Sequence, residues 1–148
     1  MRLTIVTAIF ALLLAACGGS SSDTTVAPSD AAGCEEAPQQ VLDYLATGFV
    51  NDALALESGQ TVKSGDYPDV WIVAGVLGGA EDLIGDTAAI GIWAIRAGTW
   101  PTDYVGAVAV DSVAQVTTTW GDDVDLIVTA ATDGVRAAEA CALETLIG

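Results

Sequence analysis

Two long apolar runs dominate the pattern of hydrophobic and polar positions. Residues 70–77 and 89–96 are rich in β-branched and aromatic side chains and are bounded by glycine-containing turns, so each predicts a strand buried on both faces. About a dozen residues separate the runs, which is short for a helical crossover, and we therefore expect the strands to pair antiparallel. After a turn at 98–103, residues 104–110 predict a third strand.

Helical spacing appears before these strands. Val41 and Leu45 recur at the interval of one helix face. We expect this helix to open within residues 34–38, because acidic residues and a proline are favourable in a first helical turn, and to end near Gly48. The next segment, residues 53–63, fits a short helix, a bulged strand or both in turn.

Two further helices are predicted after the strands. Asp111 stands at a cap position before a short apolar pattern at 112–119, although the threonines at the end of this segment would also suit a strand. Asp133 is expected to cap a final helix over 134–146, whose inner face includes Cys141.

Several short stretches of this region resemble small lipoproteins and secreted proteins of actinobacteria and their phages. They are Val62-Lys63-Ser64, Asp66, Val73-Ala74, Gly91-Ile92-Trp93-Ala94 and Val108-Ala109-Val110, followed by Ala114. The resemblance implies the domain limits and an α+β fold, and it assigns no catalytic residue. Together with the element pattern, it predicts a single α+β domain over residues 34–148: a small antiparallel sheet of three to four strands flanked by N- and C-terminal helices.

The first residues follow a different pattern, that of a secretory signal. Arg2 precedes an apolar run at 3–14, which is too short to span a bilayer as a helix and ends in two alanines. The sequence Leu14-Ala15-Ala16-Cys17 resembles the lipobox of bacterial lipoproteins. An ordinary secretory signal followed by a chance cysteine is the alternative.

The lipobox resemblance implies where the mature protein is located. Residues 1–16 are then a signal peptide that is removed, and Cys17 carries a diacylglyceryl group and often further acylation such as palmitate. The protein is expected on the extracytoplasmic face of the cell membrane, with the lipid on Cys17 as its membrane partner. Residues 17–33 read as the lipidated cysteine and a flexible tether, because they have too little apolar surface to fold. A coil of this length spans about 20–24 Å.

The charge of the mature chain excludes one class of function. Only Lys63, Arg96 and Arg136 oppose twenty acidic residues, which leaves a side-chain net charge of about −17. Because nucleic-acid binding needs cations to displace counterions from phosphates, we expect no nucleic-acid partner. The same charge favours a basic protein or envelope partner.

Two cysteines remain after lipidation of Cys17. Cys34 and Cys141 form an even pair in an oxidising compartment, and we expect a disulfide that ties the first ordered residues to the last helix. Two buried free thiols are the alternative.

The residue inventory restricts catalysis. The chain has no histidine, which removes imidazole-based triads and the common zinc sites. Lys63 with Ser64 lacks the spacing of a serine–lysine pair. Two acidic loops could supply a catalytic carboxylate pair or at most a weak Ca²⁺ site; they hold Glu81, Asp82 and Asp86, and Asp122, Asp123 and Asp125. Neither loop matches the EF-hand pattern, and we expect no cofactor.

Four tryptophans are many for so small a domain. Trp71 and Trp93 lie within predicted strands, and we assign them to the core. A candidate binding surface is predicted at the turns, where exposed aromatics with acidic neighbours often mark recognition. It comprises Trp100, Tyr104, Trp120, Asp103 and Asp122. The alternative is that these aromatics only cover a sheet edge.

The sequence therefore predicts a membrane-anchored lipoprotein that acts as a non-enzymatic binding module of the cell envelope. A small carboxylate-dependent hydrolase acting on envelope material is the alternative function. We expect a loss of binding, without unfolding, when an exposed tryptophan of the candidate surface is replaced by alanine.

Overall fold

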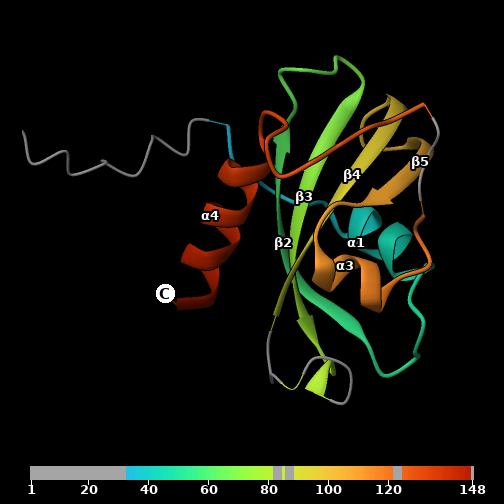
Figure 1. The fold of residues 1–148 in the computed structure, drawn as a ribbon, viewed down its shortest axis with the longest axis vertical. Helices are drawn as coiled ribbons and strands as arrows, with labels where there is room; N and C mark the ends of the chain where they lie inside the picture. The colour runs from blue at the N-terminus through green and yellow to red at the C-terminus, as the bar shows by residue number, and fades with distance from the viewer. Residues whose placement is uncertain (1–32, 82–84, 86–88, 122–124, 148) are drawn as a thin grey trace, which may run out of the picture.

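A computed structural model of the chain describes residues 33–81, 85, 89–121 and 125–147. Over these residues the chain forms one five-stranded antiparallel sheet with the strands in sequence order, and three helices pack on it (Figure 1). The elements are β1 (Glu35–Glu36), α1 (Gln39–Ala46), β2 (Ala55–Lys63), β3 (Val70–Gly78), β4 (Ala89–Thr99), β5 (Asp103–Ala109), α3 (Ser112–Thr117) and α4 (Val135–Ile147). The predicted α+β class and antiparallel pairing are confirmed.

The predicted strand number of three to four is wrong, because the sheet has five strands. The additional strand is β1, in a segment where a helix start was expected. Glu35 pairs with Thr61 and Glu36 with Gln60, and α1 begins only after Pro38. A two-residue strand leaves no periodicity in the sequence, whereas its acidic residues before a proline imitate a first helical turn.

Of the alternatives for residues 53–63, the bulged strand is correct. In β2, Leu56 pairs with Leu77 and Ser58 with Val76, so the register shifts between them. The bulge changes the face to which the following side chains point. It places Thr61 and Lys63 on the same face as α1.

The two faces of the sheet carry different helices. Helices α1 and α3 cover one face and α4 covers the other (Figure 1). Along β3, Val73 and Leu77 pack towards α1, while Ile72 and Ala74 pack towards α4. The two central strands are therefore buried on both faces, as their apolar runs predict.

Trp93 fills the centre of the α1 side. Its side chain is fully buried, as predicted, and its indole lies over Gly91 and beside Gly75, which face each other across β3 and β4. A Cβ added at Gly91 would overlap this ring. These two glycines are therefore needed for close packing.

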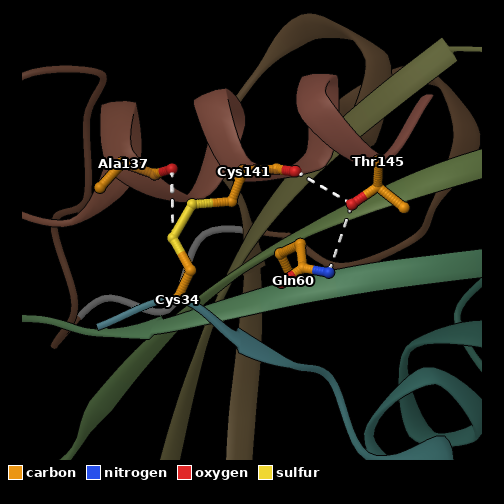
Figure 2. The surroundings of a disulfide bond; sticks show 5 residues. All are labelled: Cys34, Gln60, Ala137, Cys141 and Thr145. Carbon is orange, nitrogen blue, oxygen red and sulfur yellow. Dashed lines mark hydrogen bonds between the residues drawn. A yellow bond between two sulfur atoms is a disulfide. The ribbon is translucent and has the colours of Figure 1, made fainter. Parts of the chain in front are cut away.

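Cys34 and Cys141 form the predicted disulfide, which joins the residue before β1 to α4 (Figure 2). Their Cα atoms are 6.5 Å apart, and the two residues are 107 positions apart in the chain. Beside the bridge, Gln60 of β2 donates a hydrogen bond of 3.4 Å to the Thr145 hydroxyl, which itself donates to the Cys141 carbonyl. The disulfide thus fixes the start of the domain to its last helix, and the Gln60 hydrogen bond ties β2 to the same helix.

Candidate functional site

Five aromatic side chains from five separate segments form a continuous row on the α1 side of the sheet. In spatial order the row consists of Trp71, Trp100, Tyr104, Tyr44 and Trp120. Successive ring centroids are 4.8, 6.5, 4.3 and 5.0 Å apart. All five side chains are partly exposed. This set is called the aromatic row below.

Three members of the row were predicted from the sequence: Trp100, Tyr104 and Trp120. The first two are in direct contact, and Tyr44 lies between Tyr104 and Trp120. Trp100, in the turn between β4 and β5, meets Tyr104 of β5 edge to face. Trp120 does not contact Tyr104 in the same way, because Tyr44 of α1 stacks on Tyr104 and stands between them. Sequence reasoning missed Tyr44, although it lies in the predicted first helix beside residues of the core face.

Trp71 was predicted to be core, and this is wrong in part. Its ring stacks on Trp100 with an angle of 5° between the planes, and the Lys63 ammonium lies 5.1 Å from its centroid. Lys63 is on β2 and Trp100 follows β4, so the two flank Trp71 from opposite sides of β3. Trp71 is partly exposed and lies outside the apolar cluster that packs with α1, and it is the terminal ring of the row.

Trp120 is the most firmly held member. Its indole N–H donates a hydrogen bond of 2.9 Å to the Leu45 carbonyl at the end of α1. A Cβ at Gly48 would overlap its ring, so the glycine there makes room for it. Trp120 therefore ties the segment after α3 to α1.

The orientation of the rings decides which parts of them a partner can reach. Tyr104 and Tyr44 are nearly parallel, with 21° between their planes, and Trp71 and Trp100 are closer still to parallel. Each stacked pair therefore covers one face of each of its two rings. The indole N–H groups of Trp71 and Trp100 donate to no acceptor among the residues that the structure describes.

One carboxylate lies close to the middle of the row. Asp43 of α1 is exposed and raises the pKa of Tyr104, after the larger effect of burial and that of Tyr44. Burial also raises the pKa of Tyr44. Asp103 is exposed at the start of β5 and lies near Gly98 in the same hairpin. Asp122, the remaining predicted member, lies outside the described residues.

A side-chain contact fixes the turn that carries Trp100. Gln40 of α1 donates a hydrogen bond of 3.3 Å to the Pro101 carbonyl. The helix and the hairpin are thus connected at the row itself, in addition to the stacking of Tyr44 on Tyr104. The rings are presented by two elements that hold each other, which reduces the entropy that binding would cost.

The predicted catalytic candidates do not gather into a site within the described residues. Asp111 has a raised pKa, chiefly through burial, but its carboxylate accepts hydrogen bonds from the N–H groups of Ala114 and Ile92. It therefore caps α3 and ties it to β4, as the cap prediction required. Ser64 is buried and donates to the Asp133 carbonyl, whereas Lys63 is exposed over Trp71.

The acidic loops considered for Ca²⁺ are described only in part. Asp82, Asp86, Asp122 and Asp123 lie outside the described residues, and Glu81 and Asp125 are exposed. Among the described residues, no cluster of three or more acidic or cysteine side chains could hold a metal ion.

None of the described helices has the length and apolar character needed to cross a membrane. Comparisons with models of known protein families, with curated protein sequences and with solved structures return no match.

Proposed function

We propose that the protein is a lipoprotein, anchored by lipid on Cys17 to the extracytoplasmic face of the cell membrane, and that it binds a basic protein partner of the cell envelope. The anchor rests on the lipobox, and the tether of residues 18–33 holds the domain off the bilayer. The binding role rests on the aromatic row.

The aromatic row is the observation that supports this function. Tryptophan and tyrosine are enriched among the residues that dominate binding energy, because they bury a large area at a small entropy cost. Five such rings meet along one partly exposed line, and neighbouring elements hold them in place. Asp43 lies beside Tyr104 at the middle of the line, and the net charge of about −17 on the mature chain attracts basic partners over a longer range.

The experiment is an affinity capture from the envelope of the source cell, with the lipidated protein in mild detergent. Trp100→Ala is the test variant, since its ring lies between Trp71 and Tyr104. Val105→Ala is the matched control, because Val105 is 66% exposed and neighbours Tyr104 but takes no part in the row.

We expect the wild type and Val105→Ala to capture the same basic envelope protein. Trp100→Ala should bind that protein at least about tenfold more weakly, a loss of 1.4 kcal/mol in binding free energy. Thermal unfolding of both variants would verify that they are folded. Equal capture by the wild type and a folded Trp100→Ala variant, or no captured partner, would overturn the proposed function.

A further inference from the structure

We propose that the partner segment that contacts the aromatic row is an extended, proline-rich peptide with lysine or arginine side chains, bound in the polyproline II conformation. This inference rests on the proposed function and specifies the chemistry of the partner. Its basis is the orientation of the rings, the two indole donors that have no acceptor among the described residues, and the position of the charges.

Ring orientation favours a peptide over a sugar chain. A sugar stacks its C–H groups on an open aromatic face, but stacking covers one face of Trp71, Trp100, Tyr104 and Tyr44, and the Lys63 ammonium also lies over Trp71. Proline-rich peptides instead pack their rings against aromatic side chains that stand side by side. The exposed edges of the row offer that kind of contact.

The two indole N–H groups match the backbone of such a peptide. A polyproline II helix makes no internal hydrogen bonds, so its carbonyl groups remain free to accept. The Trp71 and Trp100 indole N–H groups have no acceptor among the described residues, and the two rings stack on each other. Carbonyls of a bound polyproline II segment can serve as their acceptors.

The length of the row sets the length of the segment. The centroid separations of 4.8, 6.5, 4.3 and 5.0 Å follow a path of about 20 Å. At about 3.1 Å per residue, this path corresponds to roughly six or seven residues in the polyproline II conformation. Such a peptide is already extended in solution, so it loses little conformational entropy on binding.

Charge complementarity places the basic side chains. Asp43 is exposed beside Tyr104 at the middle of the row, whereas Lys63 stands at its Trp71 end. A lysine or arginine of the partner is attracted to this carboxylate and repelled from the end with Lys63. The bound peptide should therefore carry its cations near Tyr104 and apolar residues near Trp71.

The test measures fluorescence anisotropy of labelled peptides with the lipidated protein in detergent micelles. The probe has the sequence PPKPPKPP, and the comparison peptides are GGKGGKGG, which keeps the charge, and PPEPPEPP, which reverses it. We expect the probe to bind at least tenfold more tightly than either comparison peptide. Trp100→Ala should weaken binding of the probe by at least tenfold, and Val105→Ala should leave it unchanged.

Trp100→Phe removes the indole N–H donor but keeps an aromatic ring, and it serves as the test variant if Trp100→Ala does not fold. We expect Trp100→Phe to weaken binding of the probe peptide several-fold without lowering the melting temperature markedly. Equal binding of the glycine peptide, no binding of the probe, or displacement only by solubilised envelope glycan would overturn the inference. If the envelope capture still depends on Trp100 in such a case, the proposed function stands and only the peptide class is wrong.

Discussion

Opening the disulfide should cost this domain a large part of its stability. The bridge between Cys34 and Cys141 closes a loop of 107 residues, and the chain-entropy model gives about 4.8 kcal/mol for a loop of that length at room temperature. Domains of this kind have unfolding free energies of about 5–15 kcal/mol. With an unfolding entropy of about 2.1 cal/mol/K per residue over about 115 residues, the loss corresponds to a fall in melting temperature of roughly 20 °C.

The structure adds a local reason for this sensitivity. Without the bridge, the start of the domain is held to β2 by the two residue pairs of β1 and by the hydrogen bond from the Ala37 N–H to the Gly59 carbonyl, and its covalent link to α4 is lost (Figure 2). β1 should therefore detach from the edge of the sheet before the rest of the domain unfolds.

Calorimetry of the oxidised protein, the reduced protein and Cys34→Ala/Cys141→Ala would test the reasoning. Reduction and the double variant should lower the melting temperature by similar amounts, and reductant should have no effect on the double variant. A reduced protein that melts within a few degrees of the oxidised protein would refute the estimate. Two thiols that react with an alkylating reagent in the native secreted protein would refute the bridge itself.

Three further predictions concern the anchor, the core and the row. Cys17→Ala should abolish incorporation of labelled palmitate and release the protein from the membrane fraction, and unchanged retention would argue against the lipobox. Gly91→Ala should lower the free energy of unfolding in urea by about 1–3 kcal/mol, because the added methyl group overlaps the fully buried Trp93 ring. Gly121→Ala is the control and should change this free energy by less than about 0.5 kcal/mol, because the nearest atom to the added methyl group is 3.9 Å away. Tyr44 and Tyr104 have pKa values raised above 10.0, so the folded protein retains their protons longer than the unfolded chain does. Their contribution to stability should be complete below pH 10 and disappear as the pH rises through the folded pKa values, which tyrosinate absorbance and alkaline unfolding would measure together.

The central strands could be predicted from sequence because their signal is continuous. Residues 70–77 and 89–96 carry β-branched and aromatic side chains at almost every position, and the structure has strands at Val70–Gly78 and Ala89–Thr99. Asp111 could be predicted as a cap because its role depends only on residues next to it in the chain. The disulfide was expected because Cys34 and Cys141 are the pair that remains when Cys17 is assigned to lipidation.

The remaining features depend on contacts between distant segments. Whether Trp71 is buried depends on which segments pack over it, and no local pattern encodes that packing. Tyr44 joins the row because α1 packs against the β4–β5 hairpin, to which it is linked by Gln40. Pairing of Glu35 with Thr61 requires the register of β2, which in turn depends on the bulge after Leu56.

Photo-crosslinking in intact cells would test most directly whether the aromatic row is the binding surface. A benzophenone amino acid at Thr102 places the reactive group in the exposed turn beside Trp100 and leaves all five rings in place. The same group at Glu144 of α4, on the opposite side of the sheet, is the matched control. The account predicts a discrete protein adduct from position 102 that is lost when Trp100→Ala is added, and none from position 144. Adducts of equal yield from both positions, or none from position 102, would contradict it.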